Sequence, residues 1–472
     1  MFEPVIAPSG TLLGLLQRGR GDGTLHALAA PEAEAVAALE SCVLHDPRPD
    51  WQVENRSLYY ARLWLDLDAG LDAVAEHLFH PDDHGDDRPD EQRCGLALAV
   101  LGHLAGYGRT DALALLRRYA ERGACWQWAL DELAVRDGDE ALRLLGPAVL
   151  ARFPRTPEGE QALAAAVAES FEPRPWNLWA KDERLGARVR AAQERRSFEL
   201  WQRQLRPRGP RPDWSVTAVL DWARQGYEEK PDQPRHAAAA RCLAAVALAT
   251  DHPVLVAAAR GGEDGARAAA LAHLAAVADT EALDLIELAA QTGSAYVAET
   301  ALCVFGCMRS AAALRRARGW VRRPDALGTA AAVMLARRGA PQDSEAVRGA
   351  LLRTVRLEGP DAKALWALTE GAGRLGIREA APVLRHVYRE TASSQLRGIT
   401  AAALAATDAA FAASFAVECL WDCEESTREL AARTAETADA RVAERLRRLA
   451  ADPAEEAGVQ TAVRTRMSPD GS

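Results

Sequence analysis

Apolar residues recur at intervals of three and four along most of the chain, and no segment shows a sustained strict alternation of apolar and polar positions. This spacing places apolar side chains on one face of an α-helix, whereas a half-buried strand would alternate. In the C-terminal half, an Ala-rich helical segment is followed by a short break of Gly, Asp, Pro or Ser and then by a second amphipathic segment. The pattern therefore predicts paired helices and an all-α fold.

The helical pairs repeat along the chain. Equivalent apolar positions in the first helix of successive pairs are separated by 28 to 36 residues. One such pair cannot bury its own apolar faces, so each pair must stack on the next, which predicts an α-solenoid. The equivalent positions are Leu243, Leu271, Leu302, Met334, Leu368 and Leu404.

The first helices are Ala-rich with an early arginine, at Arg267 and Arg397, and a Gly or Asp separates the two helices, at Asp279 and Gly376. These features resemble HEAT-like repeats, especially the short bacterial and armadillo-type kind. The resemblance covers residues 235–452 clearly, and residues 92–152 show the same unit. It implies a right-handed α-solenoid of about ten helical hairpins whose concave surface binds a partner. It implies no catalytic chemistry.

Five segments follow from this pattern. We expect a divergent N-terminal helical cap with the first repeats over residues 1–91, and HEAT-like repeats over 92–152. An irregular basic connector with one long helix, from Lys181 to Arg206, is expected within 153–214, and further repeats over 215–452. Residues 453–472 are expected to form a disordered tail.

The connector interrupts the array and is rich in Trp, Pro and Arg. Arg174 to Arg211 holds eleven basic and four acidic residues, a net charge of +7, whereas Asp66 to Glu91 has a net charge of −9. Its tryptophans could pack on the flanking repeats, its basic face could meet the acidic stretch, or it could bind a partner, since Arg and Trp are favoured at binding hot spots. The candidate partner-binding residues are Trp176, Trp179, Arg188, Arg190, Arg195, Arg196 and Trp201.

Three further candidates lie on one predicted helix: Trp126, Trp128 and Glu132. Trp128 and Glu132 are four residues apart and share a helical face. The arrangement resembles alkylpurine DNA glycosylases built from HEAT-like repeats, which use Trp and a carboxylate on the concave surface. The chain departs from that family because it is acidic overall and no basic helix follows at the expected distance. Packing of these tryptophans between repeats is the other interpretation.

A histidine and aspartate cluster, His77-Leu-Phe-His-Pro-Asp-Asp-His84, raises the question of a metal site. His77 and His80 share a helical face, and imidazole with carboxylate can bind zinc. No known ligand signature is matched, so we interpret the segment as a polar loop between helices. His77, His80 and His84 remain the alternative metal candidates.

The eight cysteines are scattered, which indicates no disulfide scaffold. Cys303 with Cys307 and Cys419 with Cys423 form two pairs at a spacing of one helical turn. The two pairs are far apart in a linear array, so we expect buried core cysteines rather than a shared metal site. No phosphate-binding loop, GxSxG or HExxH motif is present, and we predict no catalytic residue and no cofactor.

Composition narrows the functional classes. The 472 residues are 49% apolar and 26% charged, as in ordinary globular proteins, and the net charge of −10 argues against a general polyanion binder. The chain has neither a signal-like N-terminus nor a run of about 20 apolar residues, so we expect a cytoplasmic protein without membrane partners. The leading hypothesis is a non-catalytic HEAT-repeat scaffold that binds a protein or peptide on its concave surface. The alternative is a HEAT-like protein that binds or repairs DNA.

Overall fold

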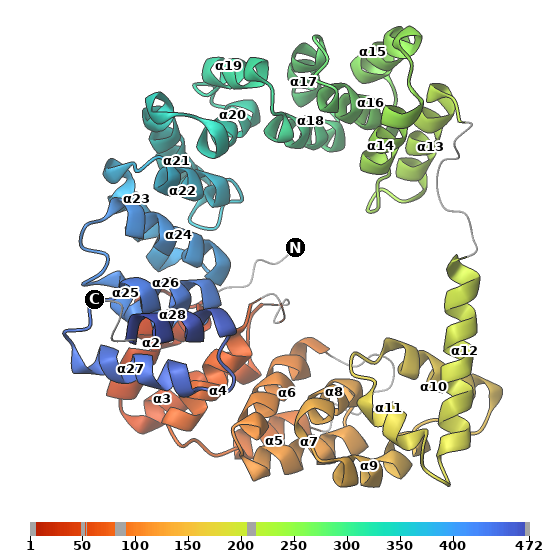
Figure 1. Ribbon diagram of the computed structural model, residues 1–472, viewed down its shortest axis with the longest axis vertical. Coiled ribbons are helices and arrows are strands. Elements are labelled where there is room, and N and C mark those ends of the chain that lie inside the picture. The colour runs from red at the N-terminus through yellow and green to blue at the C-terminus, as the bar shows by residue number, and fades with distance from the viewer. Residues whose placement is uncertain (1–5, 49–51, 53, 81–90, 205–213, 468–472) are drawn as a thin grey trace. The chain divides into compact units, whose positions relative to one another are not determined.

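The computed structural model describes residues 6–48, 52, 54–80, 91–204 and 214–467, without the side chains of 196–204. Within these ranges the chain forms twenty-eight α-helices and no strand, which confirms the all-α prediction (Figure 1). Polar side chains begin many of the helices: Ser215, Ser294, Ser310 and Asp325 each accept a hydrogen bond from a backbone N–H of the first turn. Such caps satisfy N–H groups that the helix itself leaves unpaired.

Contacts divide the chain into two compact units. Unit 1 combines residues 1–206, 389–401 and 410–472, and unit 2 combines residues 207–388 and 402–409. The helices that lie wholly in unit 1 are α1 (Leu12–Gln17), α2 (Gly21–Ala29), α3 (Glu32–Leu44), α4 (Arg56–Asp66), α5 (Asp72–Leu78), α6 (Glu91–Gly106), α7 (Thr110–Arg122), α8 (Trp126–Arg136), α9 (Asp139–Ala151), α10 (Pro157–Glu169), α11 (Arg174–Trp179), α12 (Gly186–Gln204), α25 (Phe415–Cys419), α26 (Glu425–Thr434), α27 (Ala440–Ala451) and α28 (Ala457–Met467).

Unit 2 contains the helices of residues 207–388. They are α13 (Val216–Glu229), α14 (His236–Val246), α15 (His252–Gly261), α16 (Asp264–Ala276), α17 (Ala282–Ala290), α18 (Ala295–Cys307), α19 (Ala311–Trp320), α20 (Ala326–Arg338), α21 (Ser344–Glu358) and α22 (Leu365–Arg374), with short 3₁₀ turns at Ala249–Asp251, Pro341–Asp343 and Arg378–Ala380. The unit boundary crosses α23 (Ala381–Glu390) and α24 (Ser394–Thr407).

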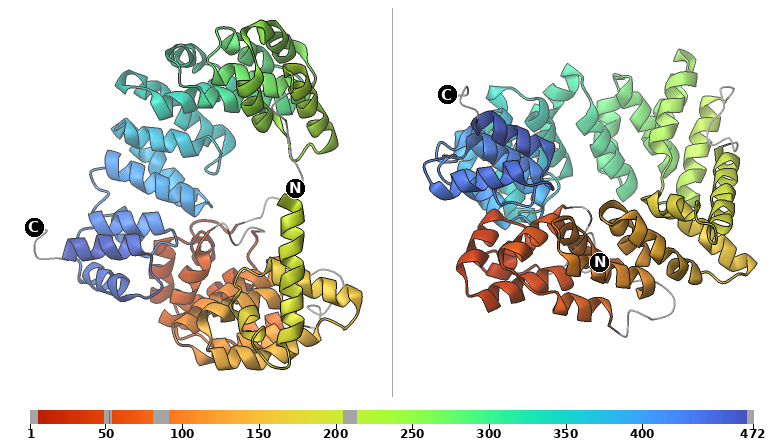
Figure 2. Two further views of the ribbon diagram at one scale, coloured as in Figure 1. Left: turned by 45° about the vertical axis from the view of Figure 1, so that its right-hand side comes forward. Right: turned by 60° about the horizontal axis from the view of Figure 1, so that its bottom comes forward.

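Unit 2 contains the predicted helical pairs. The even-numbered helices from α14 to α22 pack each on the next, and α15, α17, α19 and α21 each pack on the even-numbered helix that follows, as labelled in Figure 1. Figure 2 shows the same green-to-light-blue helices from two further sides. Leu243, Leu271, Met334 and Leu368 from the repeat alignment are buried in this row. Leu302 is only half-buried, and the neighbouring Ala301 is buried instead. The spacing of apolar residues therefore identified the core-facing positions of these helices to within one residue.

Small residues let these helices approach closely. A Cβ atom on Gly371 of α22 would lie 2.5 Å from the Cβ and 2.6 Å from the Cα of Ala336 on α20. Arg374, one turn further along α22, donates hydrogen bonds to the carbonyls of Ala336 and Gly339, at 2.9 Å each, which satisfies the C-terminal end of α20. The abundance of Ala and Gly is thus used in helix-to-helix contact as well as in helix formation.

Unit 1 joins segments from opposite ends of the sequence. Helix α2 packs on α25, and the blue C-terminal helices lie beside the red N-terminal ones in Figure 1. The side chains of Arg397 and Asp422 have no exposed surface, and Arg397 donates to both Asp422 oxygens, at 2.7 and 2.9 Å. Arg397 also donates to the carbonyl of Gly19, and the N–H of Cys423 donates to that carbonyl at 2.9 Å. These bonds connect three segments that are distant in sequence.

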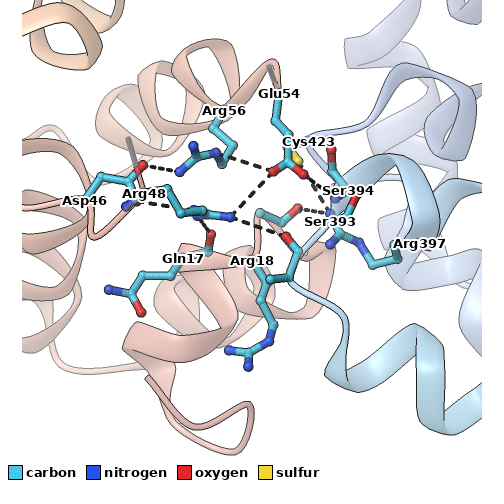
Figure 3. Close-up of polar contacts among 12 residues, drawn as sticks. Gln17, Arg18, Asp46, Arg48, Glu54, Arg56, Ser393, Ser394, Arg397 and Cys423 are labelled. Carbon is cyan, nitrogen blue, oxygen red and sulfur yellow. Dashed lines mark hydrogen bonds and ion pairs between the residues drawn. The ribbon is translucent and has the colours of Figure 1, made fainter. Parts of the chain in front are cut away.

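Figure 3 shows more of this network. Glu54 accepts a hydrogen bond of 2.6 Å from the N–H of Ser394 and forms ion pairs of 3.5 Å with Arg48 and Arg56. Asp46 pairs with the same two arginines, and Arg48 also donates to the carbonyl of Ala392. The four side chains are between 1% and 12% exposed and carry opposite charges, which is the condition under which largely buried ions are tolerated.

A second network joins α4 to the C-terminal helices. Arg62 forms ion pairs of 2.8 Å with Asp452 and 3.0 Å with Glu455, and Arg428 pairs with Glu455 at 2.7 Å. Burial, the largest single influence, opposes ionisation of Glu455, but the charge and hydrogen bonds of Arg428 together with the charge of Arg62 and the N–H of Glu456 outweigh it and lower the pKa of that carboxyl. Tyr107, directly after α6, donates to Asp452 at 2.9 Å. These pairs add to the attachment of the C-terminal helices to the N-terminal ones.

Two expected segments differ from the structure. Residues 457–467 form α28, which packs on α26 and α27, whereas residues 453–472 were expected to be a disordered tail; residues 468–472 lie outside the described residues. The connector contains three helices, and its long helix begins at Gly186 rather than Lys181, because Asp182 accepts hydrogen bonds from the N–H groups of Arg184 and Leu185 and fixes a turn there.

None of the described helices combines the length and the apolar composition that crossing a bilayer requires.

Candidate partner-binding groove

A groove opens between α9, the loop after it and the start of α12, all within unit 1. Its volume is about 370 Å³, within the range of small-ligand and peptide side-chain pockets. Apolar side chains and guanidinium groups both line it. The lining residues are Pro147, Leu150, Ala151, Phe153, Pro154, Arg155, Arg184, Leu185 and Arg188.

Tryptophans of the connector place α11 beneath this groove. Trp176 and Trp179 are 2% and 0% exposed, and their rings meet edge to face with centroids 5.0 Å apart. Trp179 donates its indole N–H to the carbonyl of Leu142 on α9 at 2.7 Å. Trp176 meets Trp126 of α8 edge to face at 6.5 Å. These two tryptophans are core residues that dock the connector on the preceding helices, and they are not available as surface contacts.

Arg188 holds α12 against the end of α9. It pairs with Glu160 of α10 at 2.8 Å and donates to the carbonyls of Leu150 and Phe153 at 3.1 and 2.7 Å. Its donors are therefore largely used inside the protein. Arg188 shapes one wall of the groove, but most of its hydrogen-bonding capacity is already taken.

Arg155 and Arg184 are the chemically available cations of the groove. Both side chains are exposed, and neither forms an ion pair with any carboxylate among the described residues. They stand beside the apolar surface of Leu150, Phe153 and Leu185. Guanidinium groups bind carboxylate with paired hydrogen bonds. The groove can therefore hold a group that is apolar on one side and anionic on the other.

The remaining arginines of the candidate set lie elsewhere on α12. Arg190 donates to the carbonyl of Ala180, which closes the turn before the helix, and does not line the groove. Arg195 is exposed on the following turns. Arg196 and Trp201 belong to α12, but their side chains lie outside the described residues. Of the predicted residues whose side chains are described, only Arg188 lines the groove.

The helix that carries Trp126, Trp128 and Glu132 is α8. Trp126 is 9% exposed and packs edge to face on Phe153 as well as on Trp176, so it is a core residue. Trp128 is half-buried. The Glu132 carboxylate packs against Gly102 of α6, where a Cβ atom would lie 1.8 Å from it. Trp126 therefore packs between helices, as the other interpretation of the sequence expected.

Glu132 has a perturbed acidity. Burial raises the pKa of this carboxyl to about 7, although the Arg136 guanidinium, in an ion pair at 2.5 Å, acts in the opposite direction. On α6, burial lowers the pKa of His103 to about 4, and the charges of Arg136 and Arg62 add to that effect. Arg62 and Arg136, the arginines whose charges act on His103, are themselves paired with carboxylates.

The histidine cluster is only partly described. The His77 ring nitrogen is 3.1 Å from the carbonyl of Arg93, and the ring meets that of His45 edge to face at 5.6 Å. His80 is exposed, while His84 lies outside the described residues. No group of three metal-ligating side chains occurs in the described part of the chain. The polar-loop interpretation and the metal alternative both stay predictions, since residues 81–90 are outside the described ranges.

The cysteine prediction holds for one pair. Cys419 and Cys423 are buried, and burial raises the pKa of the Cys423 thiol to about 12. Cys303 and Cys307 are both exposed, so the prediction of buried core cysteines is wrong for them. Their apolar neighbour Phe305 faces the core in their place, which a helical face allows because residues 303 and 307 share one side and 305 lies on the other.

Sequence reasoning did not single out Arg155, Arg184 or the apolar side chains beside them. The sequence Lys181-Asp-Glu-Arg184 could have indicated a turn that places Arg184 just before a helix. That Arg184 lies beside the loop after α9 could be learned only from the three-dimensional structure.

Comparisons with known proteins give no further constraint: a scan against protein-family models, a search of curated proteins and a search of solved structures each found no match for this chain.

Proposed function

We propose that this protein is a non-catalytic helical-repeat scaffold of the HEAT-like type, and that it binds a protein partner through a short acidic segment seated in the α9–α12 groove. The segment would present a bulky apolar side chain to Leu150, Phe153 and Leu185, and a carboxylate to Arg155 or Arg184. The observation that carries the proposal is that Arg155 and Arg184, which form no ion pair within the described part of the chain, line a groove of about 370 Å³ beside apolar side chains.

The surrounding structure supports a preformed site. Buried Trp176 and Trp179 fix α11, and the three polar contacts of Arg188 fix the start of α12 against α9. A site held by rigid helices loses little conformational entropy when it binds. The exposed cations favour a partner of opposite charge. The groove contains no exposed aromatic ring pair on which nucleic-acid bases would stack, so an acidic peptide fits it better than a nucleic acid does.

The test is a selection from a library of random displayed peptides with the full chain as bait. We expect enriched peptides to combine acidic residues with a bulky apolar residue. In fluorescence anisotropy, an enriched peptide should lose at least about tenfold in affinity with Arg184→Glu or Arg155→Glu, since charge reversal places like charges together.

Arg195→Glu is the matched control, because Arg195 is exposed further along α12 and does not line the groove. Peptides without acidic residues, or equal binding by Arg184→Glu and the unaltered chain, would refute the proposed groove. Enrichment of no peptide together with salt-sensitive binding of single-stranded DNA would favour the nucleic-acid alternative instead.

A further inference from the structure

Cys303 and Cys307 form an exposed pair of thiols on α18, in unit 2. Of the eight cysteines, five are buried and Cys242 is partly exposed, whereas these two are exposed. Free cysteine is among the most buried residue types in proteins, so two exposed thiols one helical turn apart are unusual. Neither residue contributes to the core of the repeat, which Phe305 and Ala301 supply.

Helical geometry decides what the two sulfur atoms can do. Side chains four residues apart on a helix have Cβ atoms about 5–6 Å apart, whereas a disulfide needs Cβ atoms about 3.5–4.5 Å apart. A direct disulfide would therefore distort α18. One ion bonded to both sulfur atoms at about 2.3 Å each spans up to about 4.6 Å between them, which the intact helix accommodates.

The number of available ligands selects the ion. No group of three or more His, Cys, Asp or Glu side chains suitable for a metal occurs in the described part of the chain, so these thiols have no described third ligand. Zinc prefers four ligands in structural sites, and calcium and magnesium prefer oxygen. Soft thiolate ligands select Cu(I), for which two sulfur ligands are sufficient.

We propose that Cys303 and Cys307 form a two-thiolate binding site for a soft monovalent metal ion of the Cu(I) class. Each thiol loses its proton to solvent and forms one sulfur–metal bond, so a singly charged cation and two thiols give a bis-thiolate complex of charge −1 and two released protons. No electron is transferred, and no oxidant or reductant is consumed.

Charges around the pair fit a product of charge −1. Lys363, before α22, and Arg337, at the end of α20, act on Cys303 to favour its anionic form, and both side chains are exposed. Because each sulfur must lose its proton to bind the metal, the affinity of the pair for the metal should rise with pH.

The experiment is an anaerobic titration of the full-length protein with Cu(I) in competition with a chromophoric Cu(I) chelator. We expect one Cu(I) per chain to be withdrawn from the chelator, tighter binding at pH 8 than at pH 6, and unchanged monomer-to-oligomer distribution in size-exclusion chromatography. Cys303→Ser and Cys307→Ser should each abolish this competition. Cys242→Ser, a partly exposed thiol on α14, is the matched control and should retain it.

Several results would overturn the site. The chelator could keep all the copper, or competition could persist unchanged in Cys303→Ser, which would place the copper elsewhere. Copper-dependent dimers would show that two chains share the ion. Circular dichroism of each serine variant separates loss of the ligand from loss of the fold, and surface exposure of both side chains predicts unchanged helicity.

Discussion

Arg397 and Asp422 place a complete ion pair in the interior of unit 1, with both Asp422 oxygens bonded to one guanidinium. Removing one partner of such a pair leaves an uncompensated buried charge. We expect Arg397→Ala to lower the free energy of unfolding by about 3–5 kcal/mol. Urea denaturation followed by circular dichroism, compared with the unaltered chain, measures the difference.

The control for Arg397 is Arg441→Ala. Arg441 pairs with Asp439 at a similar distance of 2.7 Å, but its side chain is 77% exposed, so solvent screens the pair and the unfolding midpoint should stay nearly unchanged. Equal effects of the two substitutions would contradict the assignment of Arg397 as a buried structural charge.

The sequence indicated only in part which residues have structural roles in the interior. Arg397 was identified in sequence as the early arginine of a repeat helix, but its partner, Asp422, lies on another segment and no spacing connects the two. Trp176 and Trp179 show the converse problem. A tryptophan beside arginines is compatible with a binding surface or with a core, and only their burial at 2% and 0% distinguishes the two.

At the scale of helices, the close contact between α20 and α22 depends on the missing side chain of Gly371. An added Cβ would lie 2.5–2.7 Å from three atoms of Ala336, two of them in the backbone, so a helix must move. We expect Gly371→Ala to destabilise the protein by about 1–3 kcal/mol, as overpacking of a core does. Thermal unfolding followed by circular dichroism measures the change.

Gly349→Ala provides the matched helical substitution. Gly349 lies inside α21, and its added Cβ would meet only the end of Arg353, at 3.7 Å. Alanine has the higher helix propensity, so this variant should gain about 0.5–1 kcal/mol. A loss of stability in both variants would indicate that backbone flexibility, and not the crossing of α20 and α22, governs Gly371.

The pairing of helices was readable from the sequence because it is local. A pair repeats every 28 to 36 residues, and Leu243, Leu271, Met334 and Leu368 occupy the buried row that the spacing predicts. The connector was not readable to the same degree. Its polar composition favours solvent, but Trp179 and Arg188 fix it through contacts to α9 and α10, and Asp182 fixes the turn before α12. No periodic pattern encodes these contacts.

At the scale of the molecule, a linear array predicts that each repeat contacts only its neighbours in sequence. Unit 1 departs from that rule, because residues 389–401 and 410–472 belong to the same compact unit as residues 1–206. The polar pairs responsible, such as Arg62 with Asp452 and Glu455, join residues separated by almost the whole chain. Individual side chains in amphipathic helices do not specify such partners, so the sequence could not predict this arrangement.

This arrangement predicts that the chain can be divided without losing unit 1. Fragments 1–206 and 207–472, expressed together with an affinity tag on the first, should purify as a complex because the second fragment supplies the C-terminal part of the unit. Arg62→Glu in the first fragment places a third carboxylate beside Asp452 and Glu455 and should abolish co-purification.

Arg143→Glu tests whether charge reversal alone disrupts the fragments. Arg143 is 53% exposed, and its contact with Asp139 is at 4.0 Å within the first fragment, so co-purification should survive this change. Independent purification of two folded fragments would show instead that the N-terminal and C-terminal segments do not need each other. If the fragments still associate with Arg62→Glu in place, apolar contacts hold unit 1 together. The charged network would then determine only which segments pair.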